Sequence, residues 1–333
     1  MALRFTSLDE WRNWQSRQHL ARRVRHAILP GKPAPTAWLW HEGEDDPVLL
    51  VIVESGGSTP AQALGEVLAH LKLPFAVLGP AGLDLGLARR TEVDSADPAR
   101  GLGGVRMVLC LGSHLPLAAA AAPRMRDARL VVVQHGLLTP LAPPLPRDAT
   151  LLAWSRADAE FYTSGRADTH SHVLGSQLLW TAAQQQVPAR TERPLYLGQL
   201  HGAELPRSSM TRAAFSTCRA AQAIYRPHPA EKDRISRWTH RLMGLSGITV
   251  MAGGPSLAQA GAPVISVFST GVLEAAAAGL DAYVSYPRPP RWLGEFWERY
   301  QMRRWGGEAT PSPPIPDTEP AKAIASWVSA RLS

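Results

Sequence analysis

The sequence predicts an α/β protein built from two Rossmann-like domains that face a cleft. Its 333 residues suit two domains of roughly 150 residues each. Short apolar runs alternate with helical patterns, which is typical of parallel strands covered by helices on both faces. A polar stretch at residues 184–188 divides these runs into two similar series. We therefore expect one domain over residues 1–183, a second over 184–317, and a terminal helix over 318–333 that crosses back to the first.

Composition narrows the class of protein further. Hydrophobic residues make up 45% and charged residues 19% of the chain, so a packed core is expected and a disordered chain is not. The two cysteines, Cys110 and Cys218, exclude a disulfide scaffold and fit a reducing compartment. No run approaches the roughly 20 apolar residues of a membrane span, and residues 1–10 lack the pattern of a signal peptide. These features predict a cytoplasmic protein.

An excess of basic residues predicts polyanionic partners. The net charge is +7 and the isoelectric point is near 9.8. Nucleotide phosphates, nucleic acid and an anionic membrane face are all candidates. The alternative is that the surface arginines only keep the protein soluble.

The amino terminus predicts a basic amphipathic helix over residues 8–29. Ser7 and Glu10 have the spacing of a capping box at its start. Trp11 and Trp14 begin an apolar stripe with arginines between its members. Such a helix either lies on anionic lipid, at the inner membrane face, or packs its tryptophans on the domain behind it.

In the first half, apolar runs that end in glycine or polar residues predict buried strands. These runs span residues 48–53, 75–78, 105–111 and 130–133. A helical pattern over residues 61–71 follows the first of them. In a doubly wound sheet, functional sites collect beyond the carboxyl ends of the strands. The residues directly after each run are therefore the first candidates.

The second half repeats the rhythm. Its predicted strands span residues 195–197, 223–225, 248–251, 264–268 and 282–285. Helical patterns over 232–245 and 270–278 lie between them, and two later ones span 292–304 and 321–332. We therefore expect a second Rossmann-like domain.

Three polar segments follow predicted strands, and the first contains His135. Gln134, His135 and Gly136 come after the run that ends at residue 133. Gly136 permits a tight turn that would present the imidazole at the strand end. Such a histidine can bind a phosphate or move a proton near neutral pH. The alternative is a structural hydrogen bond.

The second segment holds His228 between two prolines. Pro227 and Pro229 restrict the backbone of Arg226 and His228 to extended conformations. A rigidly held histidine beside an arginine suits a phosphate leaving group, because positive charge placed in advance stabilises the charge that develops. The alternative is a proline-rich turn with incidental polar residues.

The third segment is Ser269 and Thr270, followed by a helical pattern that contains Glu274. The first amides of a helix lack intrahelical partners and carry a positive partial charge, so hydroxyls there can complete an anion site. The alternative is that Ser269 only caps the helix.

A glycine-rich turn follows the first predicted strand. Ser55, Gly56, Gly57 and Ser58 lack the Walker A and GxGxxG patterns, and we interpret them as a close-approach loop for an acceptor. Glu54, just before them, is a candidate base. The histidines have no metal-ligand spacing and no GxSxG elbow occurs, so the sequence predicts no metal site, no cofactor and no hydrolase nucleophile.

Taken together, these motifs resemble those of GT-B glycosyltransferases. The resemblance rests on Gln134-His135-Gly136, on Arg226-Pro227-His228-Pro229, and on Ser269-Thr270, which follows His228 after 41 positions. The pattern is most similar to bacterial capsule polysialyltransferases, capsule Kdo transferases and CDP-glycerol glycerophosphotransferases of teichoic acid synthesis. Residues 196–202 also resemble the first strand and glycine loop of a GT-B donor domain.

The resemblance implies a metal-independent transferase that uses a CMP- or CDP-activated sugar or alditol donor. The second domain would bind the nucleotide and the first domain the acceptor, a glycan or lipid-linked molecule of the cell envelope. His228 and His135 would serve catalysis. The donor would be held by Gly198, Gln199, Arg226, His228, Ser269, Thr270 and Glu274.

Two other functions remain open at this point. Non-hydrolysing sugar-nucleotide 2-epimerases also use two Rossmann-like halves, and such an enzyme would act without an acceptor. A basic nucleic-acid-binding protein is supported by the net charge of +7. No RRM or KH motif accompanies that charge, so nucleic acid is the weaker interpretation.

Overall fold

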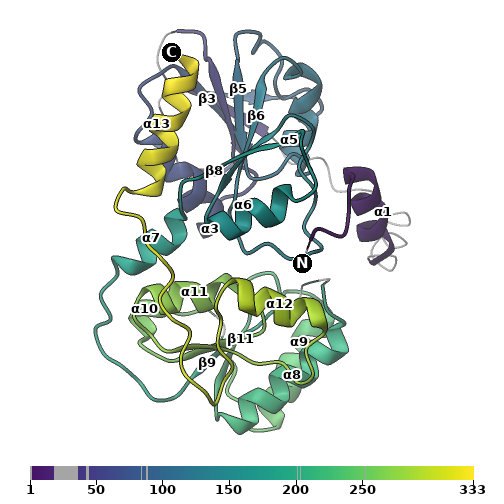
Figure 1. The fold of residues 1–333 in the computed structure, drawn as a ribbon, viewed down its shortest axis with the longest axis vertical. Coiled ribbons are helices and arrows are strands. Elements are labelled where there is room, and N and C mark those ends of the chain that lie inside the picture. The colour runs from purple at the N-terminus through teal and green to yellow at the C-terminus, as the bar shows by residue number, and fades with distance from the viewer. Residues whose placement is uncertain are drawn as a thin grey trace. The chain divides into compact units, whose positions relative to one another are not determined.

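The computed structural model describes residues 2–18, 37–42, 45–83, 85–87, 89–200, 202, 204–251 and 253–333. These residues form two compact units (Figure 1). The N-terminal unit comprises residues 2–178 and 316–333, and the C-terminal unit comprises residues 179–315. The chain passes from the N-terminal to the C-terminal unit between residues 178 and 179, within the helix α7 (Gln177–Ala183).

The N-terminal unit is built on a sheet that has eight strands in the described part of the chain, in the order β4-β1-β3-β2-β5-β6-β7-β8. Their bounds are β1 (Ala37–Glu42), β2 (Leu49–Ile52), β3 (Phe75–Pro80), β4 (Arg89–Val93), β5 (Met107–Cys110), β6 (Arg129–Val133), β7 (Thr150–Ala153) and β8 (His170–Val173). From β3 to β8, every pair of neighbours is parallel. This confirms the predicted parallel core.

The two edges of this sheet differ from the prediction. β1 is antiparallel to both β3 and β4, and none of the strands β1, β4, β7 and β8 was expected. The edge strands β4 and β8 have the sequences RRTEV and HSHV. Edge strands are often polar because they are exposed to water, so they lack the apolar run by which buried strands are recognised.

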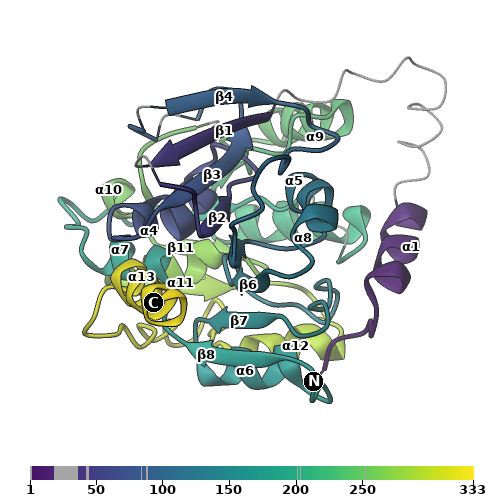
Figure 2. The same ribbon diagram turned by 90° about the horizontal axis from the view of Figure 1, so that it is seen from above.

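Helices cover both faces of the sheet, as predicted. Successive residues of β2 point into two different cores, Leu50 and Ile52 into one and Leu49 and Val51 into the other. Figure 2 shows α5 on one side of the strands and α4 and α13 on the other. The helical segments of this unit are α1 (Leu8–Gln18), α3 (Ser58–Pro60), a π-turn (Ala61–Gly65), α4 (Glu66–Leu68), α5 (Pro116–Ala121), a 3₁₀ turn (Ala122–Arg124), α6 (Arg156–Thr163) and α13 (Pro320–Leu332).

The terminal helix α13 is part of the N-terminal unit. Ile324 and Val328 are buried in the core that contains Leu49 and Val51. Gln177 accepts a hydrogen bond from the Ala321 amide at 2.9 Å, which fixes the first turn of the helix. The helical pattern over 321–332 is thereby confirmed.

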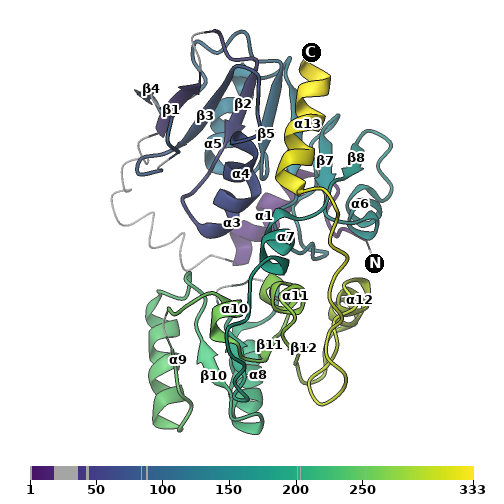
Figure 3. The same cartoon turned by 90° about the vertical axis from the view of Figure 1, so that its left-hand side faces the viewer.

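The C-terminal unit contains a parallel sheet of four strands among its described residues, in the order β10-β9-β11-β12 (Figure 3). Its strands are β9 (Leu195–Leu197), β10 (Ile224–Arg226), β11 (Val264–Ser266) and β12 (Ala282–Val284). Its helices are α8 (Arg207–Ala220), α9 (Arg234–Leu245), α10 (Leu257–Ala260), α11 (Thr270–Ala277) and α12 (Arg291–Arg299). The fold class is therefore two Rossmann-like domains, as predicted.

Two elements of the second half are corrected. The predicted strand 248–251 is reduced to an isolated bridge between Tyr225 and Val250. It lies beyond the edge strand β10, where only one side offers a partner. The predicted helix 292–304 ends at Arg299, and Gln301 has a φ of 54°, a left-handed conformation that does not continue a helix.

The amino-terminal helix is described only as α1, so most of the predicted segment 8–29 lies outside the described residues. The Ser7 hydroxyl accepts the Glu10 amide at 3.2 Å, which confirms the predicted cap. Trp11 is buried, and its indole N–H donates to the Leu141 carbonyl at 3.0 Å. In α1, therefore, Trp11 packs on protein.

No helix in the described ranges has both the length and the apolar character needed to span a membrane.

Candidate functional site

The order of the strands in the C-terminal unit defines where a ligand would bind. From β9 the chain passes to β10 on one side and later to β11 on the other, so the strand order reverses between β9 and β11. In open α/β sheets, the crevice at the carboxyl ends of such a pair is the usual ligand site. All the residues predicted to hold the donor lie at the carboxyl end of β10 or after β9, β10 and β11. We call this edge the candidate site: Gln199, Arg226, His228, Ser269, Thr270 and Glu274.

Gln199 ties the ends of β9 and β11 together. Its Oε1 accepts the Ser266 hydroxyl at 3.1 Å and the Phe268 amide at 3.0 Å. Ser266 is fully buried, and its single hydroxyl proton is shared between Gln199 and the Leu197 carbonyl, whose oxygen lies at 3.0 Å. The side chain of Gln199 therefore links the loop after β9 to the end of β11, beside the point where the strand order reverses.

Gly198 is required by packing. A Cβ at this position would lie 2.4 Å from the Tyr225 hydroxyl and 2.7 Å from a carboxylate oxygen of Glu231. Its amide donates to the Arg226 carbonyl at 2.8 Å, which extends the pairing of β9 and β10. The Gly198 amide is therefore already engaged and is not available for the predicted contact with a diphosphate.

Glu231 is the centre of a buried polar cluster that the sequence analysis missed. Its side chain is 0% exposed. One carboxylate oxygen accepts the Leu200 amide at 2.9 Å, and the other accepts the Tyr225 hydroxyl at 2.8 Å and His240 Nε2 at 2.9 Å. A buried carboxylate is tolerated when donors satisfy its oxygens, as here. The available signal was its position three residues after His228, directly before the predicted helix 232–245.

The turn that contains His228 is rigid. The His228 carbonyl accepts the Glu231 amide at 2.9 Å, and its Nδ1 accepts the Ala230 amide at 3.1 Å. A ring whose Nδ1 accepts a hydrogen bond carries its proton on Nε2 when neutral. Partial desolvation lowers the pKa of His228, although the charge of Glu231 opposes this. At neutral pH the exposed ring is therefore a neutral N–H donor.

Arg226 and Glu274 are close enough for the charge of each to affect the pKa of the other. Burial lowers the pKa of Arg226, and the charge of Glu274 opposes the shift. Burial raises the pKa of Glu274 to about 7, against the charge of Arg226. Arg226 Nη2 donates to the Pro255 carbonyl at 2.8 Å, whereas its buried Nη1 has no hydrogen-bond partner among the described residues. A buried guanidinium N–H without an acceptor favours an oxygen ligand at this place.

Ser269 begins α11 as its cap. Its hydroxyl oxygen accepts the Gly271 amide at 3.1 Å, and Thr270 is the first residue of the helix. A Cβ on Gly271 would lie 2.5 Å from Leu197, so glycine lets α11 approach β9 closely. The Ser269 oxygen is thus engaged in the cap, and its O–H and the side chain of Thr270 are the groups that could donate to an anion.

In the N-terminal unit, Glu54 lies at the corresponding reversal of strand order, between β2 and β5. Its two carboxylate oxygens accept the amides of Leu117 at 3.1 Å and Ala118 at 2.8 Å. Burial raises the pKa of Glu54, and these two amides partly offset the shift. The carboxylate stabilises the start of α5, a structural role that the sequence did not indicate. Its predicted role as a base stays a prediction.

The predicted acceptor loop is exposed at Ser55, Gly56 and Gly57, and the side chain of Ser58 lies outside what the structure describes. A Cβ on Gly56 or Gly57 would meet no atom closer than 3.5 Å. Glycine at these two positions therefore has no packing role. Gly56 also lines a groove of about 600 Å³ whose apolar walls come largely from leucines: Leu68, Leu71, Leu83, Leu85 and Leu87.

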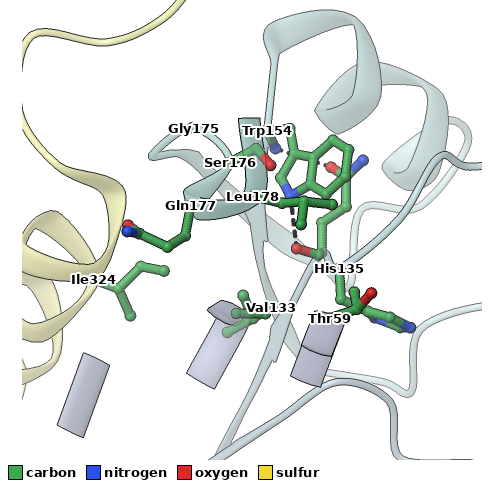
Figure 4. Close-up of a pocket in the computed structure, with 11 residues that line it drawn as sticks. Thr59, Val133, His135, Trp154, Gly175, Ser176, Gln177, Leu178 and Ile324 are labelled. Carbon is green, nitrogen blue, oxygen red and sulfur yellow. Dashed lines mark hydrogen bonds between the residues drawn. The ribbon is translucent and has the colours of Figure 1, made fainter. Parts of the chain in front are cut away.

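His135 lies in a small pocket at the ends of β6, β7 and β8 (Figure 4). Trp154 closes one side of it, and its indole N–H donates to the Gln134 carbonyl at 2.7 Å. The Gln134 Oε1 accepts the Trp154 amide at 2.9 Å. The cavity volume of about 10 Å³ is room for about one water. Burial lowers the pKa of His135, so the ring is neutral at neutral pH.

No group of three histidine, cysteine, aspartate or glutamate side chains in the described segments is arranged to hold a metal ion.

No family model matches this sequence, and no curated protein matches it. Solved structures match by fold. A UDP-GlcNAc 2-epimerase from Methanocaldococcus jannaschii, in complex with UDP-GlcNAc and UDP, aligns with a TM-score of 0.51 and 10% identity, over 85% of this chain and 99% of the epimerase.

Two further solved structures are similar to a lesser degree. A glycosyltransferase from Rickettsia africae aligns with a TM-score of 0.48 and 11% identity, over 86% of this chain and 88% of that chain. A UDP-N-acetylglucosamine 2-epimerase from Rickettsia bellii aligns with a TM-score of 0.48 and 11% identity, over 86% and 95% of the two chains.

Similarity at 10% identity shows the fold alone. The fold is of the GT-B type, two Rossmann-like domains, and that type includes both glycosyltransferases and sugar-nucleotide epimerases. Because one fold hosts several activities, the function has to be argued from the residues of the site.

Proposed function

We propose that this protein is a glycosyltransferase or alditol-phosphate transferase that binds a nucleotide-activated donor at the candidate site. The observation that supports this most strongly is that two separate segments, the end of β10 and the start of α11, meet at the carboxyl edge of the sheet in the C-terminal unit. They contribute Arg226, His228 and the start of α11 with Ser269. Each of these groups favours negatively charged oxygen.

In this proposal, phosphate oxygens of the donor meet Arg226 and the first turn of α11. The unpartnered Nη1 of Arg226 gains the acceptor that it lacks, and the Thr270 hydroxyl adds a donor at the start of α11. Fixed positive charge of this kind stabilises a phosphate leaving group without a covalent intermediate. Glu274, with a pKa raised by burial to about 7, would accept a hydroxyl of the sugar or ribose. The proposed reaction is metal-independent.

His228 would donate a hydrogen bond from Nε2 to a phosphate oxygen. We prefer this role to proton transfer because the neutral ring is already the favoured form. His228→Ala should then lower turnover by roughly tenfold or more, with a loss that is similar across neutral pH. A loss that appears only below the pKa of the imidazole, where the wild-type ring carries a proton to give, would instead assign His228 to proton donation.

The acceptor would bind to the N-terminal unit, beside Ser55, Gly56 and Gly57. The leucine-lined groove next to Gly56 fits the apolar part of a lipid-linked acceptor. The most specific part of the proposal is that the donor is activated by CMP or CDP and that the product belongs to the cell envelope. Both points depend on the resemblance of the His-Pro and Ser-Thr motifs to capsule and teichoic acid enzymes.

Titration calorimetry tests the donor site directly. CMP, CDP, UDP, GDP and UDP-GlcNAc are titrated in EDTA into the wild type, Arg226→Gln and Arg193→Gln. Arg193 precedes β9, at the opposite edge of the same sheet, where it donates to the Gln222 carbonyl and Thr249. We expect one nucleotide to bind, Arg226→Gln to weaken it at least about tenfold, and Arg193→Gln to leave it unchanged. Equal loss in both variants, or no binding at all, would refute the site.

An epimerase is the second candidate, because the solved structure with a TM-score of 0.51 is a UDP-GlcNAc 2-epimerase. An epimerase interconverts UDP-GlcNAc without an acceptor, whereas a transferase releases nucleotide only when an acceptor is present. A nucleic-acid-binding protein would show RNA affinity that falls steeply with salt and is indifferent to nucleotide.

A further inference from the structure

Helix α9 carries most of the large apolar side chains that are exposed to solvent in the described part of the chain. Five large apolar side chains are more than a third exposed in the described part of the chain, and three of them lie on this helix. The exposed fractions are 60% for Ile235, 61% for Trp238 and 86% for Leu245. Figure 3 shows α9 on the outside of the C-terminal unit. Scattered exposed leucines need no explanation, but an exposed row on one helix does.

The three residues form a continuous stripe. With about 100° per residue, Ile235, Trp238 and Leu245 fall within an arc of about 80°, and the half-buried Leu242 lies inside the same arc. The opposite side of the helix packs on the unit through Ser236, Thr239, His240 and Met243. The stripe therefore belongs to the solvent side of α9.

A row of cations adjoins this stripe. Arg234, Arg237 and Arg241 are exposed, and none of them forms an ion pair with any described residue. The acidic residue nearest to them, Asp233, is engaged: its carboxylate caps the helix and binds Arg207 at 3.1 Å. The solvent side of α9 is thus apolar along one line and positively charged along the next.

We propose that α9 is a binding surface for an anionic lipid bilayer. Tryptophan and aliphatic side chains insert favourably at the boundary between the headgroups and the acyl chains of a bilayer. The adjacent arginines complement the charge of anionic headgroups. Nucleic acid would use the arginines and stack on Trp238, but it would leave Ile235 and Leu245 in water. The core of a protein interface is depleted of charge, whereas here a row of exposed arginines lies directly beside the stripe.

The surface is preformed, because α9 is tied to its unit at both of its inner contacts. His240 binds the buried Glu231, and Arg207 of α8 binds Asp233 and Ser236 at the start of α9. Asp233 accepts the amides of Ile235 and Ser236 at 3.0 and 3.1 Å. Lipid binding would therefore not require folding of the helix, and its loss in a surface variant would not arise from unfolding.

Vesicle co-sedimentation of the full chain tests the proposal. Phosphatidylglycerol–phosphatidylcholine vesicles are compared with phosphatidylcholine vesicles, at low and high salt. The wild type should bind the anionic vesicles and be released by salt. Arg237→Gln with Arg241→Gln should weaken binding roughly 25-fold, since each charge near the surface contributes about fivefold. The control removes two exposed arginines of α8, Arg212 and Arg219, and should bind like the wild type.

The apolar stripe is tested separately by Trp238→Ser with Leu245→Ser. Binding should fall at least about tenfold, while Val173→Ser, an equally apolar exposed position in β8 (50%), should have no effect. Circular dichroism checks that each variant is folded. Wild-type-level binding by either α9 variant would overturn the proposal. So would binding of RNA in place of vesicles, or a change in self-association in place of a change in lipid binding.

Discussion

The Tyr225 hydroxyl donates to the buried carboxylate of Glu231 at 2.8 Å, and the pair lies directly against Gly198. Tyr225 is the central residue of β10, and Glu231 ends the turn that holds His228. Burial and the negative charge of Glu231 raise the pKa of Tyr225, so the phenol remains a donor. This contact fixes the His228 turn to the sheet and so fixes the geometry of the candidate site.

Gly198→Ala should destabilise the C-terminal unit. The added methyl group would overlap Tyr225 and Glu231, and overpacking of this kind costs about 1–3 kcal/mol. Urea unfolding followed by circular dichroism measures the loss. Gly294→Ala, in α12, is the control, because a Cβ there meets nothing within 4 Å. It should leave stability unchanged or raise it slightly. Equal midpoints for the two variants would show that Gly198 has room after all.

Glu231→Ala should be more severe than Glu231→Gln. Alanine leaves the Leu200 amide, the Tyr225 hydroxyl and His240 without an acceptor in a buried place, at roughly 1–3 kcal/mol for each unsatisfied group. Glutamine retains one acceptor oxygen. Thermal unfolding of the two variants and the wild type gives the order directly. If both variants unfold at the same temperature as the wild type, the cluster contributes nothing to stability.

Glu274 should make stability depend on pH. Its folded pKa is raised by burial from 4.5 to about 7, so the folded state holds a proton that the unfolded state releases. Stability from this group is present below pH 4.5 and is lost as the pH rises to about 7, by up to about 3 kcal/mol. Glu274→Gln should remove this loss, whereas Glu298→Gln, at an exposed position in α12, should not. Unfolding curves on both sides of the window measure the difference, and parallel pH profiles for wild type and Glu274→Gln would contradict it.

Glu54→Ala should loosen the start of α5. Two amides lose their acceptor, and the loss of a helix cap typically costs about 0.5–2 kcal/mol. Hydrogen exchange at Leu117 and Ala118 should accelerate, and Glu54→Gln should restore part of the protection. Unchanged exchange in Glu54→Ala would mean that the carboxylate is not the cap. It would then be available for the base role that the sequence suggests.

Much of the fold could be predicted because burial leaves a pattern in the sequence. The strand 195–197 and the helical patterns ending at residues 245 and 332 agree with the structure to within a few residues. Ser7 was also recognised as a helix cap from local spacing. The polar edge strands β4 and β8 left no such pattern, because their outer sides have no apolar core to contact.

The sequence by itself determined the fold class and the three motifs after strand ends, one in the N-terminal unit and two at the carboxyl edge of the C-terminal sheet. Only the tertiary structure decided what each residue contacts. Gly198 faces a phenol and a carboxylate, Glu54 caps a helix, and Glu231 gathers donors from β10, α9 and the loop after β9. The physical reason is that periodicity records whether a side chain is buried. Its hydrogen-bond partners depend on which strands and helices lie side by side, and those come from distant parts of the chain.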